Sequence, residues 1–107
     1  MFYTFPFTMK KDLRYVELFE LYQGLLTEKQ REIFSSHYLL DLSLAEIAEP
    51  EGNTRQSVYA AVKKVKEKLD EYEEILSFYS KKKKLVELAE SIGNDELKDR
   101  IIDIVGR

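Results

Sequence analysis

The most informative part of the chain is residues 43–58, which read Ser-Leu-Ala-Glu-Ile-Ala-Glu-Pro-Glu-Gly-Asn-Thr-Arg-Gln-Ser-Val. This order predicts two short helices hinged at a glycine. In such a unit the two helices approach closely, so the first helix needs a small residue where they meet. The hinge needs a residue with a permissive backbone, and the second helix needs a buried branched residue. Ala48, Gly52 and Val58 stand at these positions. The spacing therefore predicts a helix-turn-helix and points toward nucleic acid.

Two further helices are predicted before this motif. Apolar residues over 12–26 recur at helical spacing and cover a broad face, which indicates a helix with much surface to bury. Thr27 and Gln30 then form a capping box that starts a second helix. Ser43 and Glu46 form another box, which opens the first helix of the helix-turn-helix.

The chain after the hinge is also helical. Thr54 supplies an N-cap, and apolar residues from Val58 to Tyr79 recur every three or four positions, which predicts one long helix. An amphipathic stretch follows and closes at Gly93, after which Asn94 caps a last helix. The C-terminal third is therefore expected to form a helical hairpin.

The long helix exceeds what a helix-turn-helix needs by about three turns, at ~3.6 residues per turn. Its apolar seam could pack against the first helix of the same chain or of a second copy. Because two-fold oligomers are the commonest kind, we expect a homodimer.

Composition restricts the fold and the chemistry. The 107 residues are 44% hydrophobic and include only two prolines and four glycines, which favours an all-α protein with a modest core. Because there is no cysteine, neither disulfides nor cysteine-based sites can form, and we expect a cytoplasmic protein. His37 is the only histidine and no glycine-rich phosphate loop is present, so we expect no enzyme activity, no metal site and no cofactor.

The sequence predicts three parts. Residues 1–11 are apolar and aromatic but lack a basic start and a cleavage site, so we expect an N-terminal arm rather than a targeting peptide. This arm could pack on its own subunit or on a neighbouring one, or it could be an extension before a start at Met9. Residues 12–80 are expected to form the helix-turn-helix domain with its extended fourth helix, and residues 81–107 the hairpin. No membrane insertion is expected.

Charge is unevenly distributed along the predicted recognition helix. The whole chain carries a net charge of -3, which argues against a generic polyanion binder. Residues 54–68, however, hold five cations against the single acid Glu67, whereas the next dozen residues carry acids only. A groove-binding helix needs hydrogen-bond donors near its start and cations beside them, so this distribution fits nucleic-acid binding.

Six side chains of this helix are the candidate nucleic-acid contacts. Arginine can pair with guanine, glutamine with adenine, and serine or tyrosine with phosphate, while lysines deeper in the helix can hold phosphates. The alternative for the lysines is an ordinary solvated helix face. The candidates are Arg55, Gln56, Ser57, Tyr59, Lys63 and Lys64.

A second basic segment is Lys81 to Lys84. Four adjacent lysines could engage RNA or an acidic protein surface. The alternative is a solvated connection or the middle of a continuous helix, because cations at a helix start oppose its dipole.

Three segments resemble one known family. They read Leu-Leu-Thr-Glu-Lys-Gln-Arg at 25–31, Ser-Leu-Ala-Glu-Ile-Ala at 43–48 and Thr-Arg-Gln-Ser-Val-Tyr at 54–59. In this order they are similar to the YlxM family of bacterial signal-recognition-particle-associated proteins, over about residues 18–76. The resemblance implies a fold like region 4 of sigma factors. It also implies an accessory or regulatory factor of that particle, which contacts its RNA, its GTPase or DNA.

Two features of the turn differ from those of a typical DNA-binding helix-turn-helix. Glu49 and Glu51 place acids near a bound phosphate, and Asn53 stands where sigma-like turns usually carry an aliphatic anchor. Two alternatives to a particle accessory therefore stay open. One is a DNA-binding transcriptional regulator, and the other is a non-catalytic protein-interaction scaffold.

Overall fold

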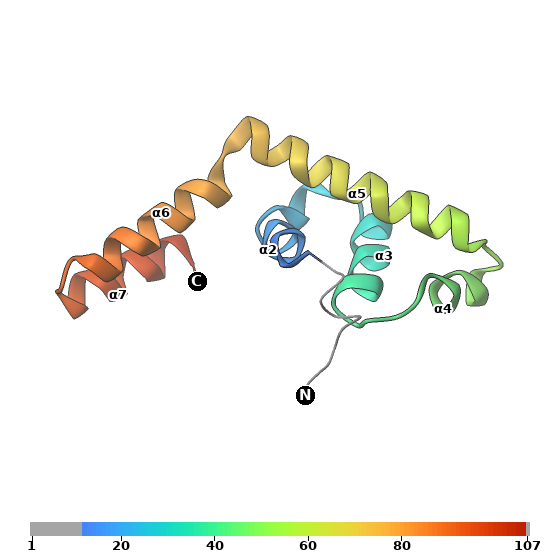
Figure 1. Ribbon diagram of the computed structural model, residues 1–107, viewed down its shortest axis with the longest axis horizontal. Helices are drawn as coiled ribbons and strands as arrows, with labels where there is room; N and C mark the ends of the chain where they lie inside the picture. The colour runs from blue at the N-terminus through green and yellow to red at the C-terminus, as the bar shows by residue number, and fades with distance from the viewer. Residues whose placement is uncertain (1–11, 107) are drawn as a thin grey trace. The chain divides into compact units, whose positions relative to one another are not determined.

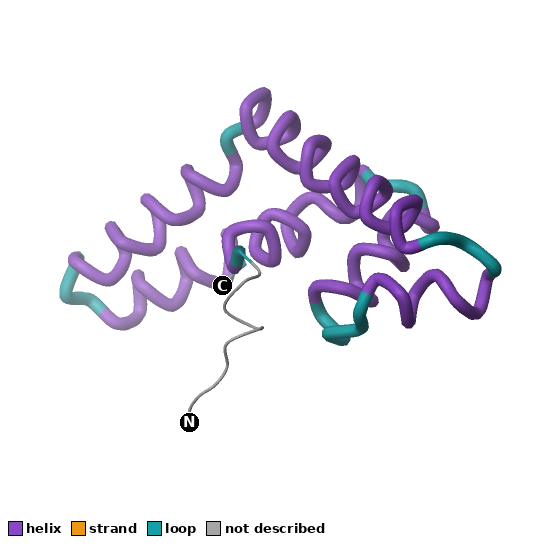
Figure 2. Tube along the Cα trace, turned by 45° about the vertical axis from the view of Figure 1, so that its right-hand side comes forward, coloured by secondary structure: helices purple, strands orange, loops and turns teal. Residues whose placement is uncertain are grey.

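The computed structural model describes residues 12–106, in which the regular elements are helices and no strand is present (Figure 1; Figure 2). The all-α prediction is confirmed. The predicted N-terminal arm, residues 1–11, lies outside the described residues. The elements are α2 (Leu13–Tyr22), the 3-10 turn η1 (Gln23–Leu25), α3 (Glu28–Tyr38), α4 (Leu44–Ala48), the 3-10 turn η2 (Glu49–Glu51), α5 (Arg55–Leu76), α6 (Phe78–Ser91) and α7 (Asp95–Val105).

The chain divides into two compact units, one ending at Tyr72 and the other beginning at Glu73. The first unit holds α2 to α4 and most of α5, and the second holds the end of α5 with α6 and α7. Within residues 12–106, no helix combines the length and the apolar content needed to cross a bilayer.

Both predicted capping boxes are present. The Thr27 hydroxyl accepts a hydrogen bond from the Gln30 backbone N–H, and the Gln30 side chain accepts one from the Thr27 N–H. Ser43 and Glu46 exchange the same pair of bonds at the start of α4. Each cap satisfies backbone donors that the helix cannot, and is worth about 1 kcal/mol. These caps fix where α3 and α4 begin.

The helix-turn-helix geometry is also confirmed. Ala48 of α4 and Val58 of α5 are both 3% exposed, so the small residue and the branched residue of the motif are both buried, as the spacing predicted. Gly52 adopts a left-handed conformation with φ +68°, and its N–H donates to the Glu49 carbonyl. Thr54 caps α5, because its side-chain oxygen accepts from the Ser57 N–H at 3.0 Å. The chain therefore turns at Gly52 and starts α5 immediately afterwards.

The apolar seam of α5 is buried by its own chain. Val58, Val62, Val65 and Leu69 are at most 6% exposed, and Val65 and Leu69 are fully covered. Phe19 of α2 stacks on Phe34 of α3 with ring centroids 4.8 Å apart, and both rings are buried in the same core. Of the two packing modes predicted for the seam, packing within the chain is the one observed over 58–69.

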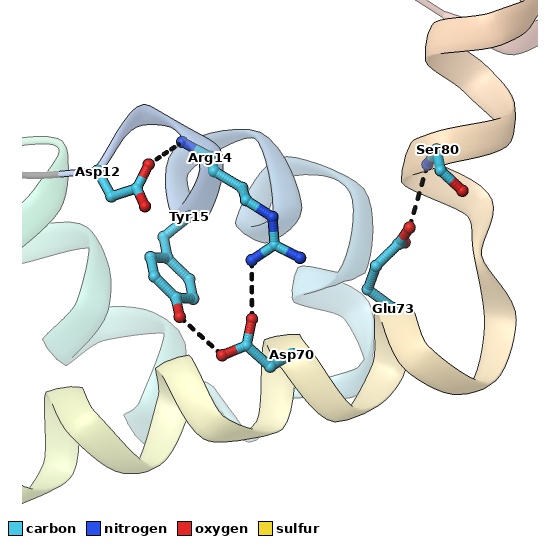
Figure 3. A network of polar contacts seen from close by, with 6 residues as sticks. All are labelled: Asp12, Arg14, Tyr15, Asp70, Glu73 and Ser80. Carbon is cyan, nitrogen blue, oxygen red and sulfur yellow. Dashed lines mark hydrogen bonds and ion pairs between the residues drawn. The ribbon is translucent and has the colours of Figure 1, made fainter.

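Polar groups at the edge of this core fasten α2 to α5 (Figure 3). The Asp70 carboxylate accepts hydrogen bonds from the Tyr15 hydroxyl at 2.7 Å and from the Arg14 guanidinium at 2.8 Å. The hydrogen bond to Asp70, helped by burial, raises the pKa of Tyr15 to about 12. Burial raises the pKa of Asp70, but the bonds from Tyr15 and Arg14 outweigh it and leave that pKa below its usual value.

The long helix ends earlier than its periodicity predicted. Ser77 has φ +57°, so α5 stops at Leu76 and Tyr79 belongs to α6. The Glu73 carboxylate accepts the backbone N–H groups of Tyr79 and Ser80 at 3.0 and 3.1 Å, as Figure 3 shows for Ser80. These donors lack intrahelical acceptors in the first turn of α6. The prediction of one helix through Tyr79 was therefore wrong, because a carboxylate one turn upstream stabilises a new helix start.

The C-terminal hairpin is confirmed as a pair of adjacent helices. Helices α6 and α7 lie side by side and run in opposite directions (Figure 1; Figure 2). Gly93 lies in the connection after α6 with φ +75°. The side-chain oxygen of Asn94 then accepts a hydrogen bond from the Leu97 N–H at 3.1 Å and caps α7. Lys81 to Lys84 lie inside α6 and not in the connection before it.

The conformation of Gly52 predicts a specific stability effect. Gly52→Ala should lower the free energy of unfolding by about 1 kcal/mol, because a Cβ is strained at positive φ. No atom lies within 4 Å of that Cβ, so backbone strain alone is tested. The matched control is Gly24→Ala, which meets no neighbouring atom and has no positive φ. Urea unfolding followed by circular dichroism measures both, and equal midpoints would contradict the role given to Gly52.

The Tyr15 to Asp70 contact predicts a pH-dependent contribution. Tyr15→Phe should lower the free energy of unfolding by about 1 kcal/mol at neutral pH, because one part-buried hydrogen bond to a charged carboxylate is lost. The folded pKa of Tyr15 is raised, so its contribution is complete below about pH 10 and is lost as pH rises toward 12. The difference between wild type and variant should shrink over that range. Denaturation curves at stepwise alkaline pH would show it, and a pH-independent difference would refute the assignment.

Candidate nucleic-acid interface

The six predicted contact residues all belong to the first three turns of α5. Arg55 is the first residue of the helix, and Gln56, Ser57, Tyr59, Lys63 and Lys64 follow it. All six are exposed, and Tyr59 retains 59% of its surface. The helix-turn-helix packing covers only the opposite side of α5. The structure therefore leaves every predicted contact accessible to a ligand.

These residues fall on two sides of the exposed surface of α5. At ~3.6 residues per turn, Gln56, Tyr59 and Lys63 form one line along the helix. Ser57 and Lys64 form a second line, about a third of a turn away. The predicted set is therefore not one surface, and a ligand seated on the first line reaches the second only at its edge.

Arg55 and Ser57 differ in what they can offer a ligand. Arg55 opens the helix, where exposed backbone N–H groups and the positive end of the helix dipole favour anions. The Ser57 hydroxyl donates to the Thr54 carbonyl at 2.9 Å, so its proton is already used locally. Arg55 can donate to a phosphate or a base edge, whereas Ser57 in this conformation can only accept.

The acids of the turn are partly neutralised. Glu51 forms an ion pair with Lys29 at the start of α3, with the Lys29 Nζ 2.6 Å from its carboxylate oxygen. The hydrogen bond to Glu51 raises the pKa of Lys29, so the Lys29 ammonium stays charged at neutral pH. One of the two carboxylates expected to repel a phosphate is therefore compensated by a cation from another helix.

Two shallow grooves border the first line of α5. One, of about 450 Å³, lies against α3 and α4 and includes His37, Ser43 and Glu46 in its wall. The other, of about 280 Å³, lies against α2 and includes Tyr15 and Asp70. The grooves share the α5 residues Tyr59, Val62 and Lys66.

Lys66 is the residue that the sequence prediction omitted. Its Nζ lies 4.9 Å from the centre of the Tyr15 ring, a cation-π distance, and its side chain lines both grooves. It continues the line of Tyr59 and Lys63 by one turn. The signal was present in the sequence, because Lys66 follows Lys63 at a helical spacing of three and Tyr59 at seven.

His37 has a structural role. Its Nδ1 lies 2.8 Å from the Leu42 carbonyl oxygen and, as an N–H donor, links the end of α3 to the connection before α4. In the part of the chain that the structure describes, no three His, Asp or Glu side chains gather in a way that could hold a metal ion. The exposed side chains of α5 include cations, an amide group and an aromatic ring, which are groups that can contact the phosphates and bases of a nucleic acid.

Comparison with known proteins agrees with this architecture. Residues 9–105 match the UPF0122 family, described as "Putative helix-turn-helix protein, YlxM / p13 like". A UPF0122 protein of Halalkalibacterium halodurans is 46% identical over 84 residues, which cover 78% of this chain and 77% of that protein. One from Shouchella clausii is 38% identical over 103 residues, covering 92% and 94% of the two chains. One from Ureaplasma parvum is 40% identical over 89 residues, covering 83% and 90%. The chain belongs to the UPF0122 family of YlxM/p13-like proteins.

Proposed function

We propose that this protein binds nucleic acid through the first turns of α5 and has no catalytic activity. The observation that carries the proposal is the exposed line of Gln56, Tyr59 and Lys63, which begins beside Arg55. A buried valine seam and the turn at Gly52 hold this part of α5 on the core. Donors and cations on a firmly packed helix are what groove contacts and phosphate contacts require.

We further propose that the protein is a cytoplasmic regulatory or accessory factor of the bacterial signal recognition particle pathway. The support is the resemblance to the YlxM family together with the family match. The ligand best suited to this role is the particle's structured RNA, with the particle's GTPase as a further partner. A homodimer is part of the same proposal.

The charge of the interface favours a ligand other than long duplex DNA. Only Arg55, Lys63 and Lys64 are exposed cations of the α5 start, while Glu49 and Glu51 lie in the turn before it. About three phosphate contacts give a modest, salt-sensitive affinity. A DNA-binding transcriptional regulator is the rival function, and it would need specific base contacts from Arg55 and Gln56 to compensate.

The interface is tested by removing its two base-reading candidates. Arg55→Ala combined with Gln56→Ala should weaken nucleic-acid binding about tenfold or more, because each such contact contributes ~1–3 kcal/mol. Fluorescence anisotropy with labelled signal recognition particle RNA and with duplex DNA measures the loss. The matched control is Arg100→Ala with Gln23→Ala, which removes the same two residue types from exposed positions elsewhere.

All variants should keep the helical circular dichroism signal and unfolding midpoint of wild type, because the four residues are exposed. Binding that is unchanged in the Arg55 and Gln56 variant, or equally weakened in the control, would contradict the assignment of the interface.

The class of ligand is tested by competition at several salt concentrations. A particle accessory should prefer structured particle RNA or the GTPase over random duplex DNA. The logarithm of its RNA affinity should fall with the logarithm of salt with a slope of about -2 to -3, as expected for three phosphate contacts. A transcriptional regulator should instead select one duplex sequence from a random pool. Binding to the GTPase alone, with neither nucleic acid retained at moderate salt, would indicate a protein-interaction scaffold.

A further inference from the structure

Tyr59 differs from the other tyrosines that the structure describes. Each of the others has a partner for its ring or for its hydroxyl group. Tyr15 donates to Asp70, Tyr72 donates to the Leu25 carbonyl, Tyr22 packs against Tyr72, Tyr38 stacks on Phe34 and Tyr79 lies beneath the Lys83 ammonium. Within residues 12–106, Tyr59 has no ring partner and no hydroxyl partner, and 59% of its surface is exposed. The fold therefore does not explain an aromatic ring at this position.

Two cations follow the Tyr59 ring along α5. Lys63 and Lys66 lie one and two turns beyond it, about 6 and 10 Å along the helix axis at ~1.5 Å per residue. Both line the groove against α2 together with Tyr59. The Lys66 ammonium lies 4.9 Å from the centre of the Tyr15 ring, so α2 helps to position this cation. A ligand that covers the Tyr59 ring therefore lies beside two positive charges.

The groove against α2 carries an excess of positive charge. Lys63 and Lys66 line it together with Glu67 and Asp70. Asp70 forms an ion pair with Arg14, whose guanidinium nitrogen lies 2.8 Å from the carboxylate oxygen (Figure 3). With Arg14 included, three cations stand against two acids. A phosphate is therefore attracted to this side of the Tyr59 ring.

The groove against α3 and α4 has the opposite balance. Its charged side chains are Asp41, Glu46 and Lys66, which are two carboxylates against one cation. Carboxylates repel phosphates but accept hydrogen bonds from the amino groups of bases. A nucleotide at Tyr59 is therefore expected to place its phosphate toward α2 and the edge of its base toward α3 and α4.

An aromatic ring can stack only on a base whose face is uncovered. In a duplex, neighbouring bases cover these faces, and the edges of the bases are what a side chain can reach from a groove. Bases in RNA loops and bulges are unpaired and can stack on aromatic side chains of proteins. Among nucleic acids, a ligand with an unpaired base therefore makes the fullest use of the Tyr59 ring.

We infer that the Tyr59 ring stacks on an unpaired base of a structured RNA, and that Lys63 and Lys66 hold the phosphate of that nucleotide. Tyr59 then binds through its ring and not through its hydroxyl group. Arg55 and Gln56, which precede it on the helix, contact the adjoining nucleotides. This inference rests on the nucleic-acid binding proposed above and names the feature of the ligand that the interface recognises.

The stacking contact is tested with two RNA hairpins that differ in a single base. One hairpin carries a bulged adenosine, and the other carries an abasic ribose at the same position, so both have the same phosphates. Wild type should bind the bulged hairpin about tenfold more tightly, because stacking one base on an aromatic side chain contributes a factor of about this size. Fluorescence anisotropy at low salt measures both dissociation constants.

Three variants separate the ring from the hydroxyl group. Tyr59→Phe should keep the tenfold preference, because the ring remains. Tyr59→Leu should bind both hairpins equally, with about the wild-type affinity for the abasic hairpin. The matched control is Phe78→Leu, which removes a ring that is 51% exposed on α6 and should keep the preference. All three variants should retain a helical circular dichroism spectrum, because both side chains are exposed.

The position of the phosphate is tested at Lys66. Lys66→Met should weaken the binding of both hairpins by the same factor and reduce the salt slope by about 1, since both ligands carry the phosphate. The matched control is Lys68→Met. Lys68 is also half-buried, but it follows Tyr59 by two and a half turns and lies on the opposite side of α5. Unchanged binding in Lys66→Met, or an equal loss in Lys68→Met, would overturn the phosphate position.

Several outcomes would overturn the stacking assignment. These are equal wild-type binding of the two hairpins, a preference that survives in Tyr59→Leu, and a preference that is lost in Tyr59→Phe. If the Arg55 and Gln56 variant still weakens binding in these cases, the proposed interface stands and the assignment of the ring alone is wrong. Binding of neither hairpin nor particle RNA at low salt would overturn the proposed function and this inference together.

Two further measurements exclude other ligands for the ring. The same two hairpins made as DNA should bind more weakly than the RNA pair, and equal or tighter binding of the DNA pair would overturn RNA as the source of the base. If Tyr59→Leu weakens binding of the particle's GTPase and leaves both hairpins unaffected, the ring belongs to a protein interface and the inference is wrong.

Discussion

The position of every candidate contact depends on how the apolar seam of α5 packs on α2 and α3. Val58, Val62, Val65 and Leu69 fix which side of the helix faces inward. Because side chains recur every ~3.6 residues, that choice also determines which residues face outward. The Asp70 bonds to Tyr15 and Arg14 add a polar contact farther along the same helix. The accessible residues of the candidate interface are thus a consequence of hydrophobic packing on the opposite side.

Much of the fold could be predicted from the sequence because its signals are local. Capping boxes, a glycine at a left-handed position and apolar periodicity each act within about one helical turn. They correctly predicted the starts of α3 and α4, the turn at Gly52 and the hairpin connection at Gly93. The family resemblance, based on three short segments around these signals, was confirmed over residues 9–105.

The features that escaped prediction depend on contacts between different helices or on unusual backbone. Ser77 bears no glycine or proline signal, so the end of α5 could not be read from periodicity. The Lys29 to Glu51 ion pair joins residues 22 positions apart and changes the charge of the turn. The contact of Lys66 with the Tyr15 ring could not be predicted, because it depends on how α2 packs beside α5. The six contact residues and the residue ranges of the predicted parts remain predictions.

The shortest α-helix of the first unit is α4, with five residues between its Ser43 cap and the η2 turn. A helix this short forms too few internal hydrogen bonds to persist alone, so it exists only while its Ser43 cap and the burial of Ala48 are kept. Local opening of a protein starts where protection is weakest. In this chain such an opening would release the Gly52 turn, and with it the start of α5, before the remaining core unfolds. On the interface proposed above, a ligand that holds the start of α5 should therefore also slow amide-proton exchange in α4.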